Sequence, residues 1–166
     1  YGYLCVSDNS STSGNYSSVL GGISSTASAT KSSVVNGDTS LAGHTSSTAI
    51  GPYSTTRAQY AFAFGGQSFD AQGAGQASIF NLVSDTTDAT AEAMTTNKST
   101  ASTNNQVILP NNSAYAFHGT IVARQQAADG TACAAWKVEG LIRREGSAGT
   151  TVLVNSADRK STRLNS

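Results

Sequence analysis

Apolar residues recur at a fixed spacing through the first half of the chain. Four copies of one short motif occupy residues 18–22, 33–37, 48–52 and 62–66, and equivalent positions lie 15, 15 and 14 residues apart. A fixed period of this kind indicates stacked repeats. Gly or Asn follows the apolar pair in each copy, and both tolerate the left-handed backbone of a tight corner. Each copy therefore predicts a short strand ending in a corner, at Gly21, Asn36, Gly51 and Gly65.

Each motif contributes two adjacent apolar positions, and these form two columns. One column is Leu20, Val35, Ile50 and Phe64, and the other is Val19, Val34, Ala49 and Ala63. Because neighbouring residues of a strand point to opposite faces, every strand is apolar on both sides. A coil of 14 or 15 residues encloses little volume, so one column lies inside and the other packs against partner chains. We expect a parallel homo-oligomer, in which a single chain would expose the Val19 column.

Two further columns complete the repeat. A polar column follows the corner and consists of Ser24, Thr39, Ser54 and Ser68. A column of small residues comes next and consists of Ala27, Ala42 and Ala71, with an interruption at Arg57 or Ala58. Residues 15–71 resemble the head repeats of trimeric autotransporter adhesins and the related shafts of phage tail fibres. The resemblance implies a left-handed parallel β-roll that forms a trimer. A disordered Ser/Thr-rich linker is the alternative, but it needs no bulky apolar residue in every period.

The second half predicts a different, antiparallel all-β module. Short strands are expected at 77–83, 91–95, 106–109 and from 151 onward, the second of which also suits a helix. Alternating apolar residues predict long strands near 114–128 and 131–145, joined by a two-residue turn at Asp129–Gly130. That turn pairs Gly119 with Gly140, Phe117 with Ile142, Ile121 with Val138, and Ala123 with Trp136.

Segments 109–117, 119–124 and 135–144 resemble the β-sandwich domain at the distal end of many phage tail fibres. The predicted organisation is an N-terminal end (1–14), a β-roll (15–71), a junction (72–76), an incomplete antiparallel β domain (77–157) and a tail (158–166). The tail matches the conceptual translation of a common sequencing adapter. We therefore expect residues 158–166 to be irregular and to make no core contacts.

Charge excludes some partners. The chain carries 10 basic and 10 acidic residues, and it becomes slightly acidic once the tail is set aside. No basic stripe remains to suggest nucleic-acid binding. No stretch is long and apolar enough to predict membrane insertion. Cys5 and Cys133 are too few for a metal motif and are not expected to pair, and Cys133 is expected to pack as a small apolar residue.

Candidate chemistry is sparse. His44 falls in a corner between repeats and His118 on the polar face of a strand, so both are expected to be ordinary surface residues. Asp85 and Asp88 flank a turn and either cap it or bind a cation. The sequence lacks a nucleophile elbow, a phosphate loop and zinc-ligand spacing. We therefore expect no catalytic, cofactor or metal site and no enzyme, with any ligand held by exposed loops of the second half.

These observations favour a structural and host-attachment component of a phage tail fibre. Such a chain would be an extracellular homotrimer in the virion tail, contacting other tail or baseplate proteins and a host receptor such as a glycan. The alternative is the head of a bacterial trimeric autotransporter adhesin at the cell surface, but no heptad pattern follows residue 72. A third class, a glycan depolymerase, usually needs a longer β-helix with paired acidic residues.

Overall fold

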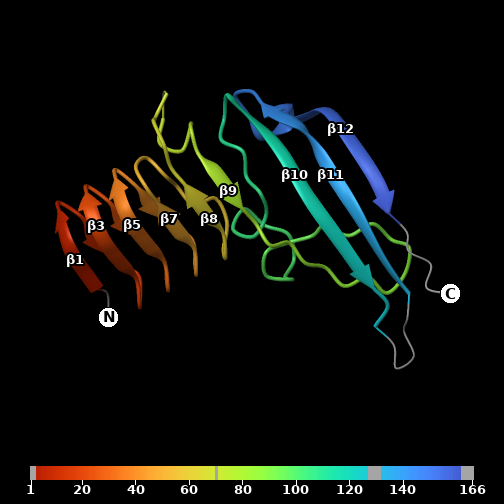
Figure 1. Ribbon diagram of the computed structural model, residues 1–166, viewed down its shortest axis with the longest axis horizontal. Coiled ribbons are helices and arrows are strands. Elements are labelled where there is room, and N and C mark those ends of the chain that lie inside the picture. Colours follow the sequence, from red (N-terminus) through yellow and green to blue (C-terminus); the bar gives the residue numbers. More distant parts are fainter. Residues whose placement is uncertain (1–2, 70, 127–131, 162–166) are drawn as a thin grey trace. The chain divides into compact units, whose positions relative to one another are not determined.

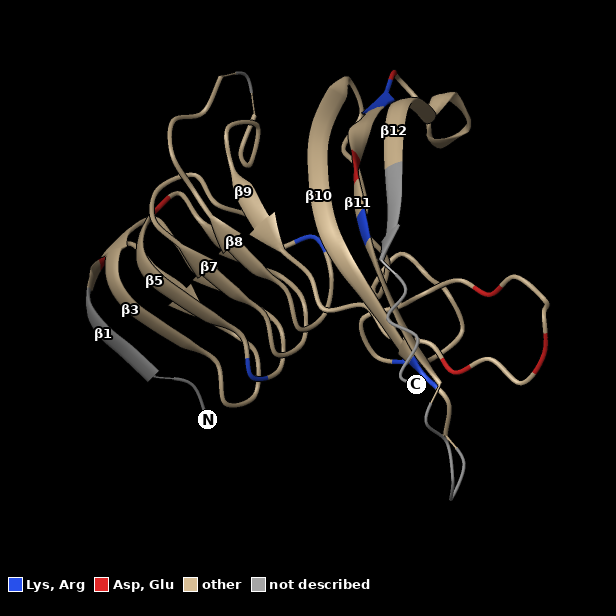
Figure 2. Cartoon of the chain, turned by 45° about the vertical axis from the view of Figure 1, so that its right-hand side comes forward, with Lys and Arg blue, Asp and Glu red and all other residues tan. Residues whose placement is uncertain are grey.

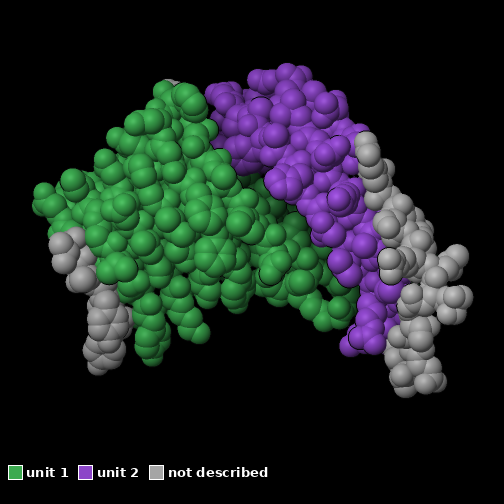
Figure 3. Space-filling model, in the orientation of Figure 1, with its two compact units in different colours: residues 1–108 green, residues 109–166 purple. Residues whose placement is uncertain are grey.

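The computed structural model describes residues 3–69, 71–126 and 132–161, and β-strands dominate it (Figure 1). Among these residues there is no α-helix, and the one helical segment is the 3-10 turn η1 (Ala148–Thr150). The chain forms two compact units, residues 1–108 and 109–166 (Figure 3). The change of module predicted at 72–76 thus falls inside the first unit, because those residues bond to the roll.

The first unit contains a parallel β-roll. Its larger sheet runs in the order β1 (Tyr3–Asp8), β3 (Ser18–Ile23), β5 (Ser33–Asp38), β7 (Thr48–Ile50), β8 (Phe62–Phe64) and β9 (Ala77–Ile79). The first five strands are parallel. Leu20 pairs with Val35, Val35 with Ile50, and Ile50 with Phe64. The predicted stacked column is therefore confirmed.

A smaller parallel sheet forms the opposite wall of the roll. It contains β2 (Ser11–Thr12), β4 (Thr26–Ala27) and β6 (Leu41–Ala42), and Thr55 extends it by a bridge to Leu41. The sequence predicts that the roll starts at residue 15, but the roll begins earlier. In β1, Cys5 pairs with Leu20, so residues 3–12 form one more coil.

The core of the roll lies between the two sheets and contains only small side chains. Val19, Val34, Ala49 and Ala63 are at most 1% exposed, and they pack with Ala27 and Ala42. The prediction that a single chain exposes this column is wrong. Leu20 is 55% exposed and Phe64 38% exposed, so the bulkier column faces outward. The narrow interior accepts Val and Ala but has no room for Leu or Phe.

Left-handed residues form the corners of the coils. Gly21, Asn36 and Gly51 have positive φ as predicted, whereas Gly65 does not. Two further left-handed columns consist of other residue types: Asn9, Ser24, Thr39 and Tyr53, and Tyr16, Lys31, Ser46 and Tyr60. In these columns the backbone N–H donates to the preceding coil, for example from Thr39 to the Ile23 carbonyl at 3.0 Å. That bond offsets the strain of a left-handed non-glycine residue.

Buried serines line the inner corners. Their Oγ atoms donate to carbonyls three residues earlier, from Ser17 to Gly14 at 2.7 Å and from Ser32 to Ala29 at 2.7 Å. Each buried hydroxyl is thereby satisfied, as its burial requires.

The predicted polar column is partly wrong. The buried column is Ser25, Ser40 and Ser54, and Ser54 N–H donates to Ser40 Oγ at 3.2 Å. Ser24 and Thr39 occupy the left-handed corner beside it instead. Ala27 pairs with Ala42 as predicted. In the following coil, Thr56 N–H donates to the Leu41 carbonyl, so Thr56 occupies the position next to Ala42. Arg57 and Ala58 therefore lie beyond the small-residue column.

The second unit contains one antiparallel sheet of β10 (Ser113–Arg124), β11 (Cys133–Arg144) and β12 (Val152–Ser161). The two long strands are confirmed, but their predicted register is wrong by two residues. Phe117 lies opposite Gly140, Ile121 opposite Trp136, and Gly119 opposite Val138. The last pair before the loop is Arg124 with Cys133, and Asp129–Gly130 lies outside the described residues.

Packing of Phe117 against Gly140 accounts for this register. A Cβ on Gly140 would lie 2.7 Å from Phe117 Cζ, so the aromatic ring covers the glycine. An aromatic side chain commonly shields a glycine on a neighbouring strand in this way. The parity of the pairing is as predicted, so Trp136 still shares a face with Ile121 and Val138.

Other predicted segments differ from the structure. Residues 91–95 and 106–109 are irregular, and only Val83 with Thr95 forms an isolated bridge. The tail prediction is wrong for residues 158–161, whose backbone pairs with β11 from Val138 to Ala135. The open edge of β11 offers free N–H and C=O groups, which any extended segment can pair with regardless of its sequence. Residues 162–166 lie outside the described residues.

Removal of the Trp136 indole should destabilise the second unit moderately. Trp136 is half-buried, so Trp136→Ala should cost about 2 kcal/mol, below the roughly 3 to 5 kcal/mol of a fully buried aromatic site. Denaturant unfolding would measure this loss of free energy of unfolding. Far-ultraviolet circular dichroism is a suitable probe, because its signal does not require the indole that the substitution removes. The control is Val122→Ala, because Val122 is 73% exposed. Equal losses for the two variants would show that the Trp136 face is not packed.

Candidate functional site

The two histidines belong to different units. His44 lies half-buried at a corner of the roll, and its burial lowers the pKa of the imidazole, an effect to which Arg57 adds. His44 Nδ1 is enclosed without a hydrogen-bond partner. His118 is exposed and lies opposite Glu139 in the second unit. The prediction that His118 is a surface residue is confirmed, whereas His44 is more enclosed than expected.

Asp85 and Asp88 lie in the loop that follows β9. Asp88 Oδ1 accepts the Thr90 N–H at 2.7 Å, and hydrogen bonds from the side chain and backbone of Thr90 lower the pKa of this carboxyl. Asp85 forms an ion pair with Lys98. The role predicted for Asp88, capping a turn, is therefore confirmed. No group of three or more metal-ligating side chains occurs in the part of the chain that the structure describes.

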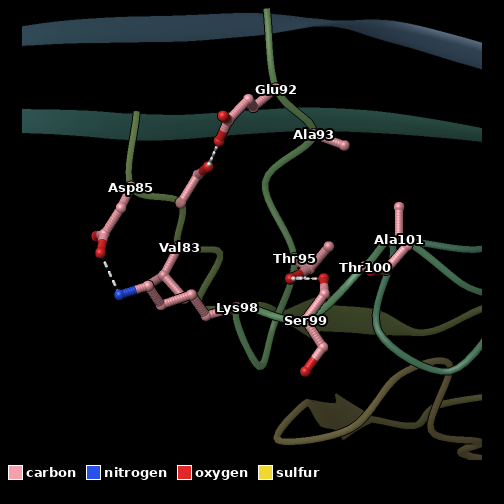
Figure 4. A pocket seen from close by; sticks show the side chains of 10 residues that line it. Val83, Asp85, Glu92, Ala93, Thr95, Lys98, Ser99, Thr100 and Ala101 are labelled. Carbon is pink, nitrogen blue, oxygen red and sulfur yellow. Dashed lines mark hydrogen bonds and ion pairs between the residues drawn. The ribbon is translucent and has the colours of Figure 1, made fainter. Parts of the chain in front are cut away.

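A shallow pocket of about 300 Å³ lies between this loop and residues 93–101 (Figure 4). The Asp85–Lys98 pair and the 3.1 Å hydrogen bond from Ser84 to Glu92 border it. The remaining lining is small or hydroxylated: Val83, Ala93, Thr95, Ser99, Thr100 and Ala101. Such a surface offers donors, acceptors and both signs of charge to a polar ligand.

The floor of this pocket is a loop with a polar core. Asn105 is 2% exposed, its Oδ1 accepts the Ser102 N–H at 2.7 Å, and its Nδ2 donates to Asn97 Oδ1 at 2.8 Å and to the Thr100 carbonyl at 3.0 Å. Asn97 Nδ2 in turn donates to Gln59 Oε1 at 2.9 Å. The loop is therefore anchored to the last coil of the roll, and a polar pocket stands on a rigid scaffold.

The outer face of the larger sheet carries apolar side chains that the roll does not cover. Leu20, Val35, Ile50 and Phe64 run in register across it, and we call this column the outer strip. A second row of the same face ends in two exposed apolar residues, Phe62 at 45% and Ile79 at 60%. Leu20 and Phe64 of the strip are exposed, and Val35 and Ile50 between them are half-buried. Adjacent apolar groups on an outward-facing sheet are typical of interaction surfaces.

Hydroxyl groups accompany the outer strip. Ser18 Oγ donates to Ser33 Oγ at 2.9 Å, and Thr48 continues that row. Charges are rare on the roll: Asp8, Lys31, Asp38 and Arg57 are its charged residues within 3–69, and Figure 2 shows them as isolated patches of colour. A face with few charges has little desolvation cost when a partner covers it.

Cys133 is exposed, so the prediction that it packs as a small apolar residue is wrong. It begins β11 at the end of the hairpin ladder, opposite Arg124. The described residues include no helix with the length and hydrophobicity needed to cross a bilayer.

Comparisons of the chain with protein-family models, with curated proteins and with solved structures give no match.

Proposed function

We propose that this chain is a structural and host-attachment component of a phage tail fibre, in which three parallel copies form a shaft. The observation that carries the proposal is the outer strip, an in-register apolar column that faces outward from a roll whose own core is already filled; Leu20 and Phe64 are exposed, and Val35 and Ile50 are half-buried. The resemblance of the repeats to adhesin heads and tail-fibre shafts supports it. The bacterial trimeric adhesin head is the second candidate, because it rests on the same repeats.

The physical reason for assembly is the thinness of the roll. The buried side chains of its coils are Val, Ala, Ser and Thr, so the larger apolar groups have no place inside one chain. Strips on parallel copies match one another coil by coil, since each has the same spacing along the stack. Burying Leu, Ile and Phe side chains contributes about 1.5 to 3 kcal/mol each. An assembly of three copies covers every strip at a single axis.

Attachment to a host would use the polar pocket at residues 83–101. Its hydroxyl and carboxylate groups suit the hydroxyls of a glycan, for which hydrogen bonding is the main means of recognition. A trimer presents three such pockets, and multivalency raises the strength of binding to a surface with repeated ligands. We assign no catalysis: Asp85 is paired with Lys98 and Glu92 accepts a bond from Ser84, so each carboxylate has a structural partner.

The proposal predicts that a charge in the outer strip dissociates the assembly. Leu20 is 55% exposed in one chain, so Leu20→Asp should leave the roll folded while placing three like charges at one axis. Sedimentation equilibrium should give about three times the chain mass of 16.9 kDa for the wild type and a large shift toward one chain mass for the variant. Thr30→Asp is the matched control, because it adds the same charge at an exposed corner.

A wild-type protein that is folded and monomeric at micromolar concentration would refute the trimer. Retention of the wild-type mass by Leu20→Asp would instead show that another face holds the copies together.

A further inference from the structure

In the inner coils, each strand forms backbone hydrogen bonds with the coils on both sides. The last coil has no following coil, so some of its backbone N–H and C=O groups need other partners. Leu41 N–H donates to the Ser54 carbonyl at 2.9 Å, and the Leu41 carbonyl accepts the Thr56 N–H at 3.0 Å. Ser54 and Thr56 therefore bond backwards, toward β6. In a parallel strand the residue between them, Thr55, points its N–H and C=O to the other side, where a further coil would stand.

A glutamine side chain occupies that position. Gln76 Oε1 accepts the Thr55 N–H at 2.9 Å, and Gln76 Nε2 donates to the Thr55 carbonyl at 2.9 Å. The primary amide thus replaces both hydrogen bonds that the peptide groups of a next strand would make. Nε2 also donates to Ser78 Oγ at 3.0 Å, which holds the amide in place.

Gly73 reproduces the corner of a further coil. Tyr53 N–H donates to the Asp38 carbonyl at 2.7 Å, and Gly73 N–H donates to the Tyr53 carbonyl at 2.7 Å with a φ of +78°. A Cβ on Gly73 would lie 2.8 Å from Gln76 Oε1, so only glycine leaves space for the amide. Gln72 Nε2 adds a bond of 2.6 Å to the Thr39 carbonyl.

The larger sheet ends by a change of strand direction. β9 pairs antiparallel with β8, from Phe62 with Ile79 to Phe64 with Ala77. Residues 72–79, which we call the end cap, therefore cover both sheets and one corner of the last coil.

We propose that the end cap blocks the stacking of a further coil supplied by a second copy of this chain. An uncovered parallel coil is a template for another coil with the same period, and the same chain supplies such coils. Stacking of one end on another is a head-to-tail contact, which does not close and leads to filaments. The end cap therefore keeps association lateral, along the outer strip, and prevents growth along the axis of the roll.

Substitution of Gln76 tests the proposal. In Gln76→Glu one carboxylate oxygen still accepts from Thr55, but the other faces the Thr55 carbonyl and cannot donate. Amide hydrogen exchange at Thr55 should accelerate about tenfold, the effect of losing about one hydrogen bond. Sedimentation velocity at increasing concentration should then show species larger than the wild-type assembly. Gln67→Glu is the matched control, because Gln67 is exposed.

Two results would overturn the proposal. Unchanged exchange at Thr55 in Gln76→Glu would show that the amide does not protect this edge. Faster exchange without any larger species would show that an open edge does not recruit a second copy. If Gln76→Glu loses its β-sheet circular dichroism, Gln76→Ala is judged by the same two measurements, because it removes both amide bonds to Thr55 without adding a charge. Since each variant is compared with the wild-type mass, failure here is distinguishable from failure of the trimer.

Discussion

Val34→Asp is expected to unfold the roll at neutral pH. Val34 is fully buried in the third coil, between Val19 and Ala49 of the neighbouring coils. A carboxylate there finds no cation, and an unpaired buried ion costs several kcal/mol. That loss is comparable with the whole free energy of unfolding of a small domain, about 5 to 15 kcal/mol. Far-ultraviolet circular dichroism and thermal unfolding at pH 7 would measure it.

Acidification should partly rescue this variant. Burial raises the pKa of the introduced carboxyl above its value in the unfolded chain, so the penalty appears as pH rises through the unfolded value of about 3.9. Unfolding at about pH 4 should therefore be less severe than at pH 7. Thr30→Asp provides the control for charge alone, because Thr30 is exposed at the corner that precedes β5. Similar melting temperatures for both variants would contradict the assignment of Val34 to the core.

The period of the repeats predicts the stacked coils and the Leu20 column. It does not predict which of the two apolar columns faces the interior of the roll. Both columns are apolar, so alternation alone does not say which faces inward. Side-chain volume does: the inner column declines from Val19 to Ala63, whereas the outer strip ends in Phe64. The same spacing also predicts the first coil, since Leu4 and Cys5 precede Val19 and Leu20 by one period.

Features set by contacts distant in sequence were less predictable. Turn preference placed the hairpin two residues from its true register, because the match of Phe117 to Gly140 is a property of the paired strands and not of the loop. The corner positions of Lys31 and Ser46 have no local signature, since their left-handed φ depends on a bond to the preceding coil.

The candidate site also depends on contacts between residues that are distant in the sequence. The sequence indicated exposed loops in the second half, and Asp85 in one of them, but not the pocket. Lys98 reaches Asp85 only because Asn105 folds residues 95–105 into a closed loop through bonds to Ser102, Asn97 and Thr100. Gln76 likewise lies 21 residues from Thr55, and no local pattern marks an amide that replaces a strand.

Gly22→Ala is expected to cause the second large loss of stability. Gly22 has a φ of +110°, which a residue with a Cβ rarely adopts, and its added Cβ would lie 2.0 Å from the Gly37 carbonyl oxygen of the next coil. The backbone strain and the clash each cost about 1 to 3 kcal/mol, so the total is about 4 kcal/mol. The coils cannot separate locally to relieve the clash, because Leu20 and Ile23 hold β3 in register with β5 on either side.

Denaturant unfolding of the intact chain would measure this loss, with Gly43→Ala as the matched control. A Cβ on Gly43 would lie no closer than 3.5 Å to its nearest neighbour, Leu41 Cγ, and Gly43 has no positive φ. Gly43→Ala should therefore unfold within about 1 kcal/mol of the wild type. A Gly22→Ala variant as stable as Gly43→Ala would mean that β3 and β5 do not approach as closely as the stacked register requires.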